Sequence, residues 1–451
     1  MTILLIALLG INTFIFYNQW KKLFYLLIIA VPYLGYLQLH TFTYTIFAPI
    51  SHDFIFIIPL VIIFIASRKN LNILPLQVRK LVFLLIILLF MQLFNPTNEL
   101  NFVGRLVGLK IWIFYFFCIF ISYHAIEDKN DLKKFCNVFA VSALIPCVIG
   151  IVQYFLILSL GYQRGMGLFY LDANLASLST QNYAQFSYGP LSLFRIPSTF
   201  SFVAQYLNFI LAAFVPIITS IYLSISLNEK RFYKYILILA SIAAFLSGAR
   251  SAGIFLPIFI IFFYYQEGKF MNIKFFGIKT LVIIGICLIV YDNFYYAEYL
   301  TGLGYDYITN EFFYNLTGNI KEFFFGNGLG SKTSGARYVD VETNMVQLRN
   351  EGYYWKVIIE LGVLGLFLIV SLFFSYLHQT NLVKKKISLY KEKVFCSAFY
   401  AYCSFHMIAA FKSWVTFDGY PTNFIFFIFL GIIFKLGSKE YFDKSYLKLN
   451  K

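Results

Sequence analysis

The sequence predicts an all-α, polytopic integral membrane protein, a bundle of about 12 to 14 transmembrane helices with two long outer loops. Hydrophobic residues make up 60% of the chain, charged residues only 13%, and the mean hydropathy is +0.73. Apolar runs of about 20 residues, the length that a helix needs to cross the hydrocarbon core of a bilayer, recur along nearly the whole chain. We therefore expect residues 1 to 451 to form a single integral membrane domain.

The apolar runs place thirteen helices, with ends fixed to within a few residues. Several of them are short for a membrane crossing, which is why the predicted total is a range. The ranges are about 1 to 17, 23 to 39, 53 to 66, 81 to 94, 105 to 123, 135 to 158, 203 to 225, 235 to 248, 252 to 265, 278 to 294, 353 to 377, 394 to 411 and 423 to 437.

The net charge of +15 follows the expected membrane topology, because the basic residues concentrate in connections on one side. It therefore gives no reason to expect a nucleic-acid partner. If the helices are as predicted, 25 of the 36 Lys and Arg residues fall in alternate connections and in the C-terminal tail, all on one side. By the positive-inside rule that side is cytoplasmic. We therefore expect a cytoplasmic C-terminus and, with an odd number of helices, an outer N-terminus.

Two long polar segments lie on the predicted outer side, at residues 159 to 202 and 295 to 352. Loops longer than about 15 residues in a compact protein commonly serve as lids or binding elements. The first ends in LFRIPSTFSFVAQYL, which brings Arg195 to the entrance of a helix. An Arg fork at this depth holds a phosphate strongly in a low-dielectric setting. The alternative for Arg195 is contact with lipid headgroups.

Arg250 lies in a Ser-Gly-Ala-Arg-Ser turn between two apolar runs, so it is expected close to the hydrocarbon boundary. A lone Arg at such a depth needs a partner, and snorkelling toward water is the alternative. Snorkelling toward the outer surface is the favoured interpretation for Lys110, which stands with Arg105 in an apolar run. The stretch from Gly326 to Thr333 lacks the Gly-Lys-Ser/Thr of a phosphate loop and is expected to be a turn.

Ionisable residues persist through the stretch RNEGYYWKVIIELGVLGL, residues 349 to 366. Glu351, where the loop meets the helix, becomes a general base if burial raises its pKa, and is otherwise a solvated carboxylate. Glu360 is expected to be structural, as a cap or in a pair with a neighbouring helix, while Gly362 and Gly365 favour close helix packing. No role is assigned to Lys356.

No metal site or cofactor site is expected, because the five histidines are scattered and the acidic residues form no Asp-x-Asp. The six cysteines lie in or beside apolar runs and are predicted to be buried thiols rather than loop disulfides.

The order of several motifs resembles the bacterial O-antigen polymerase and O-antigen ligase superfamily over residues 190 to 370. These motifs are Arg-x-Pro-Ser-Thr-Phe from Arg195, the Ser-Gly-Ala-Arg-Ser turn, a Gly-x-Gly outer loop, and Glu351-Gly352-Tyr353-Tyr354 followed by a Glu-Leu-Gly helix. Ligases of this superfamily usually present a His before Asn where this chain has Glu351-Gly352. An acidic residue followed by Gly and Tyr looks more like the polysaccharide polymerases.

The resemblance implies a metal-independent membrane glycosyltransferase of the bacterial cytoplasmic membrane, whose donor glycan is carried on a polyprenyl diphosphate at the outer face. It implies that Arg195 and Arg250 bind the donor diphosphate and that Glu351 activates the acceptor hydroxyl, with direct displacement at the anomeric carbon. Arg337 and Arg349 are expected to be secondary substrate-binding residues. Besides the lipid bilayer, the implied protein partners are a flippase and a chain-length regulator.

Three functions remain open at this point. The first is polymerisation of the repeat units of an O-antigen or a capsule. The second is a ligase or oligosaccharyltransferase that moves finished polymer to a lipid or a protein. The third is a lipid-linked oligosaccharide transporter, which should show inverted repeats and broken helices near the membrane midplane.

Overall fold

The computed structural model describes residues 2–42, 53–170, 185–188, 191–248, 250–268, 320–331, 333, 352–411, 417 and 419–441. Twelve of the thirteen predicted helical ranges fall on helices in this part of the chain, and the range 278 to 294 lies outside it. The helices are α1 (Thr2–Phe16), α2 (Trp20–Phe42), α3 (Ile58–Ala66), α4 (Leu76–Leu93), α5 (Phe102–Ile113), α6 (Phe117–Ala125), α7 (Lys129–Leu160), α10 (Val203–Leu223), α11 (Leu227–Leu246), α12 (Arg250–Gln266), α17 (Tyr353–Lys386), α18 (Tyr390–Ala409) and α20 (Thr422–Leu436).

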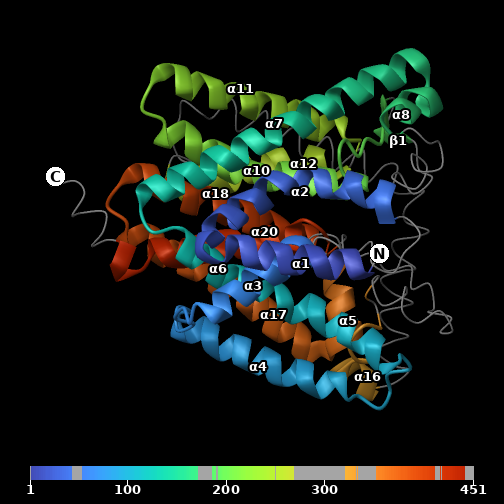
Figure 1. Cartoon of the computed structure of the whole chain (residues 1–451), viewed down its shortest axis with the longest axis vertical. Helices are drawn as coiled ribbons and strands as arrows, with labels where there is room; N and C mark the ends of the chain where they lie inside the picture. Colours follow the sequence, from blue (N-terminus) through green and yellow to red (C-terminus); the bar gives the residue numbers. More distant parts are fainter. Residues whose placement is uncertain are drawn as a thin grey trace.

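The protein is a helical membrane bundle, as the hydropathy predicts (Figure 1). Within the described residues, six helical stretches are long and apolar enough to cross a bilayer. They are Ala7–Leu37, Leu76–Leu93, Phe102–Ala125, Lys129–Leu160, Val203–Leu223 and Tyr353–Lys386. Large apolar side chains such as Phe14 and Phe367 are exposed on the outside of the bundle, where lipid rather than water is the expected solvent.

Short elements gather at one end of the bundle, the end at the right of Figure 1. They are α8 (Tyr162–Tyr170) and the antiparallel hairpin of β1 (Gln185–Tyr188) and β2 (Leu191–Phe194), in which Gln185 is paired with Phe194. The two elements belong to the first predicted outer loop, so the described part of that loop carries secondary structure, including a hairpin that departs from an all-helical chain. Helix α16 (Ile320–Phe325), which precedes the second loop's glycines, lies against α17 at the same end.

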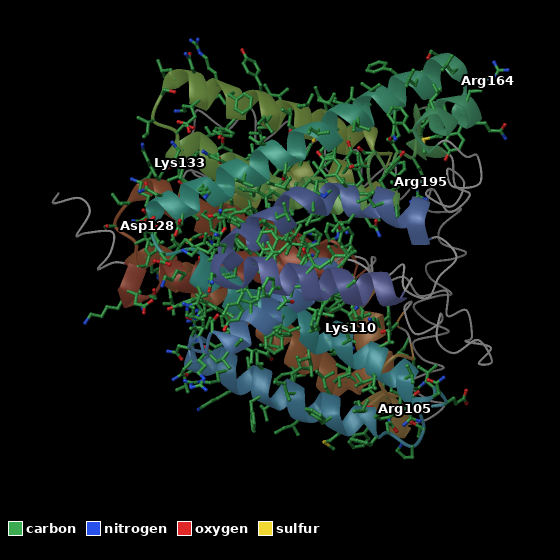
Figure 2. The ribbon with its side chains drawn as sticks, viewed as in Figure 1. Arg105, Lys110, Asp128, Lys133, Arg164 and Arg195 are labelled. Carbon is green, nitrogen blue, oxygen red and sulfur yellow. The ribbon has the colours of Figure 1, made fainter. Side chains whose placement is uncertain are left out.

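The basic connections that the structure describes lie at the opposite end of the bundle. Lys21 at the start of α2 lies 2.7 Å from Glu127, between α6 and α7. Lys133 lies 2.8 Å from Glu229 near the start of α11, and this hydrogen bond holds the pKa of the Glu229 carboxyl below its ordinary value. Figure 2 shows Asp128 and Lys133 at this end and Arg105, Arg164 and Arg195 at the other. This is the grouping of connections on which the predicted topology depends.

Helix α17 is sharply bent at Gly362, where φ is +71° and ψ is −175°. The rings of Tyr353 and Phe373 have centroids 6.5 Å apart. In a straight helix, twenty residues would separate them by about 30 Å along the axis. The helix predicted for residues 353 to 377 is therefore present but broken, and Gly362, expected to favour close helix packing, is the point of the break. Only glycine adopts this positive φ without strain.

The bend is filled by the turn that follows α16. The backbone N–H of Asn327 donates a 2.6 Å hydrogen bond to the carbonyl of Ile359, which the break frees from the helical ladder. A Cβ on Gly362 would collide with the Phe324 carbonyl oxygen, and one on Gly326 would lie 2.7 Å from the Glu360 carbonyl carbon. Glycines on both sides thus let the two backbones meet.

We expect Gly362→Ala to destabilise the purified protein by more than about 1 kcal/mol, because alanine disfavours the positive φ and its methyl group meets Phe324. Gly10→Ala in α1 is the matched control, since nothing lies within 4 Å of a Cβ there. Thermal unfolding in detergent measures both variants. Equal unfolding temperatures for Gly362→Ala and Gly10→Ala would contradict a strained break.

Candidate functional site

Arg195 lies at the loop-rich end of the bundle, directly after β2, and is partly buried (Figure 2). The next residue, Ile196, donates a 3.1 Å backbone hydrogen bond to the carbonyl of Ser247. Ser247 ends α11, so the predicted diphosphate-binding motif is attached to the tight turn between α11 and α12.

Gly248 lets the backbone of the α11–α12 turn approach the backbone of Phe194 and Arg195 closely. Its φ is +68°, and a Cβ there would collide with the Phe194 carbonyl and lie 3.2 Å from the Arg195 Cα. Arg250, two residues later, is the first residue of α12. The fold therefore brings the backbone of Arg195 against the turn that leads to Arg250, although the two residues are 55 positions apart. The side chain of Arg250 lies outside the described part of the structure.

Thr199, in the Pro-Ser-Thr-Phe segment, replaces one backbone hydrogen bond within α2. Its hydroxyl donates a 2.5 Å bond to the Pro32 carbonyl, and its own carbonyl accepts a 3.0 Å bond from the Tyr36 N–H. In a regular helix that N–H would bond to the Pro32 carbonyl, four residues earlier. Thr199 thus supplies both partners that the interrupted turn of α2 lacks.

Ser198 ties the same segment to α7. Its hydroxyl donates a 2.6 Å bond to the Pro146 carbonyl, and its carbonyl accepts a 3.2 Å bond from Gln153 Nε2. The φ of Ser198 is +52°, an uncommon conformation for a residue with a side chain. Anchors on α2, α7 and the α11–α12 turn together fix the backbone beside Arg195. The sequence motif predicted a helix entrance, but these anchors pair residues too distant for sequence spacing to show.

A second polar cluster surrounds Glu360, whose side chain is 0% exposed. Trp112 Nε1 of α5 donates a 2.8 Å bond to one carboxyl oxygen, and the Thr333 hydroxyl donates a 2.9 Å bond to the other. Lys356, also buried, has its Nζ 5.5 Å from the centre of the Trp112 ring. The expected pairing of Glu360 with a neighbouring helix is confirmed, and Lys356, which had no assigned role, belongs to the same cluster.

The glycine-rich stretch after α16 is a turn, as predicted. Side chains from the connection between α4 and α5 hold it, because Asn95 Nδ2 donates a 3.0 Å bond to the Gly326 carbonyl and Asn98 Nδ2 a 2.8 Å bond to the Leu329 carbonyl. The turn, which lies within the second predicted outer loop, therefore links the α4–α5 connection to the bend of α17.

Lys110 forms an ion pair with Asp53, which is 1% exposed. The expectation that Lys110 snorkels to the outer surface is therefore wrong, because a buried carboxylate nearby offers it a better partner than the interface does. Arg105 is also satisfied by the protein, since its guanidinium donates to the carbonyls of Leu100 at 2.9 Å and Asn98 at 2.5 Å.

Glu351, Arg337 and Arg349 lie outside the described residues. The adjoining start of α17 is described, and the Tyr354 N–H donates a 3.3 Å bond to the Ala410 carbonyl just beyond α18. Among the residues that the structure describes, no group of three His, Cys, Asp or Glu side chains is placed to hold a metal ion. The five cysteines in this part of the chain are buried and unbridged, as predicted.

Thr199→Val tests the hydrogen bond that Thr199 supplies within α2. Losing the hydroxyl leaves the Pro32 carbonyl without its donor, so we expect a loss of about 1 to 3 kcal/mol of stability. Thr219→Val is the control, because the Thr219 hydroxyl bonds only to the Val215 carbonyl of its own helix and should cost less than about 1 kcal/mol. Thermal unfolding compares the two, and a smaller effect at Thr199 than at Thr219 would contradict this role of Thr199.

No model of a known protein family matches the chain, and no curated protein matches it.

Proposed function

We propose that this protein polymerises polyprenyl-diphosphate-linked oligosaccharide repeat units of a surface polysaccharide at the outer face of the bacterial cytoplasmic membrane. The observation that carries the proposal is the attachment of the Arg195 segment to the turn before Arg250, through the Ile196–Ser247 hydrogen bond and the close approach of Gly248 to Phe194. The Arg195 segment and the turn that leads to Arg250 thus meet through their backbones, at the end of the bundle opposite the basic connections.

That arrangement suits a substrate with an apolar tail and a multiply charged headgroup. A diphosphate at the membrane boundary carries negative charges that two guanidinium groups neutralise by bidentate hydrogen bonds. The low dielectric constant near the hydrocarbon strengthens these contacts beyond their value in water. Such fixed cations favour the transition state most where charge grows on the leaving group.

In the proposed reaction, an acceptor sugar hydroxyl attacks the anomeric carbon of the donor. The new glycosidic C–O bond forms as the C–O bond to the diphosphate breaks, and the polyprenyl diphosphate leaves with the bonding electron pair. Glu351 takes the hydroxyl proton, while Arg195 and Arg250 hold the leaving diphosphate; Arg337 and Arg349 contribute to substrate binding. No metal or cofactor takes part in this proposal.

The bend of α17 is a feature that the alternative function, a transporter of lipid-linked oligosaccharides, would also share. Interrupted helices are common in secondary transporters, where they bind substrate near the membrane midplane. Here the freed backbone at the bend bonds to the Asn327 turn, and the buried Glu360 beside it bonds to Trp112 and Thr333. The described bend is thus occupied by the protein's own groups, which favours the enzyme over the transporter.

Deletion of the gene separates the candidate functions by the lipid-linked material that accumulates. We expect single repeat units on the polyprenyl carrier, accessible from the outer face, because repeat units are exported but not joined. Long polymer on the carrier would instead indicate a ligase, and single units confined to the inner face a transporter. Unchanged chain length on the carrier would refute the polymerase proposal.

Substitution of Arg195 tests the diphosphate-binding role. We expect Arg195→Ala to lower polymer formation at least about 100-fold, and Arg195→Lys to retain part of it, because lysine keeps the charge but loses the bidentate fork. Arg164→Ala is the control, since Arg164 is exposed at the same end of the bundle (Figure 2). Polymer length is measured at matched amounts of folded protein. Wild-type activity in Arg195→Ala would contradict the assignment.

A further inference from the structure

A cavity lies inside the bundle between α5, α17 and α20, with a water-accessible volume of about 40 Å³. Its wall is mainly aromatic and includes Trp112, Tyr353, Phe373 and Phe417. Besides the polar atoms of Trp112 and Tyr353, the wall includes Tyr376, which carries a hydroxyl, and Asn423, which carries a side-chain amide. Tyr376 and Asn423 are 1% and 6% exposed, so both are shielded from bulk solvent.

Neither the Tyr376 hydroxyl nor the Asn423 Oδ1 has a hydrogen-bond partner among the described residues. Leaving a buried polar atom without a partner is costly, and more so in a bundle surrounded by hydrocarbon. Such atoms in native proteins usually bond to ordered water when no protein group reaches them. Both residues line the same cavity.

The volume of the cavity and the chemistry of its wall indicate which kind of molecule it can hold. One ordered water needs about 10 to 15 Å³ of such volume, so the cavity has room for roughly three or four. An acyl or polyprenyl chain offers the two polar atoms no hydrogen bond, and none of the residues in the wall is charged, which disfavours an ion. We propose that the cavity binds a small cluster of ordered water molecules, held by Tyr376 and Asn423 inside the membrane-spanning bundle.

The cluster completes the packing where α17 folds back on itself. Tyr353 lies before the bend and Phe373 after it, yet both line the cavity. The inference is independent of the proposed polymerase activity, because it concerns only hydration of the bundle.

Tyr376→Phe and Tyr402→Phe form a matched pair that tests the site. The Tyr402 hydroxyl is equally buried and has no hydrogen-bond partner in the described structure, but Tyr402 does not line the cavity. We expect Tyr376→Phe to lower the apparent melting temperature of the full-length protein by roughly 1 to 3 °C, because it removes a hydrogen bond to water. Tyr402→Phe should leave the melting temperature unchanged or raise it.

A density map of the detergent-purified full chain, at a resolution that shows ordered water, is the second measurement. We expect separate peaks at about 2.7 to 3.2 Å from the Tyr376 hydroxyl and from Asn423 Oδ1. Continuous tubular density, as from a lipid or detergent chain, or a cavity free of density would overturn the proposal. An unchanged melting temperature in Tyr376→Phe, or an equal drop in both variants, would overturn it as well.

Discussion

The break of α17 at Gly362 is the constraint on which much of the described bundle depends. A helix interrupted in a membrane must satisfy its freed backbone groups inside the protein. Here the N–H of Asn327, in the turn after α16, donates a hydrogen bond to the Ile359 carbonyl. Beside the break, the Glu360 carboxylate accepts hydrogen bonds from Trp112 of α5 and from Thr333. Helices α5 and α17 and a turn within the second predicted outer loop therefore meet at one point.

A comparable arrangement supports the Arg195 segment at the same end of the bundle. Thr199 replaces a hydrogen bond within α2, Ser198 bonds to α7, and Ile196 bonds to Ser247. Hydrogen bonds of this kind are strong where water cannot compete. These bonds to three other parts of the bundle hold the backbone beside Arg195 in place.

The described ionisable side chains near the bend of α17 and in α5 each have a partner within the protein. Lys110 pairs with Asp53, Lys356 lies over Trp112, and Arg105 donates to backbone carbonyls. The cost of placing a charge in hydrocarbon makes such pairing necessary for folding. Ionisable residues at membrane depth therefore do not by themselves mark a catalytic site in this protein, because the protein itself supplies their partners.

Local composition determined the helical membrane fold, the positions of the helices and the one-sided basic connections, because hydropathy and loop charge act within a single segment. Tertiary structure decided the break at Gly362, the pairing of Lys110 with Asp53, and the contact of the Arg195 segment with Gly248. Each of these three features involves residues that are far apart in the chain, so it depends on which groups of another segment pack nearby. The sequence offers the glycine and the charges, but only packing determines which backbone or carboxylate they meet.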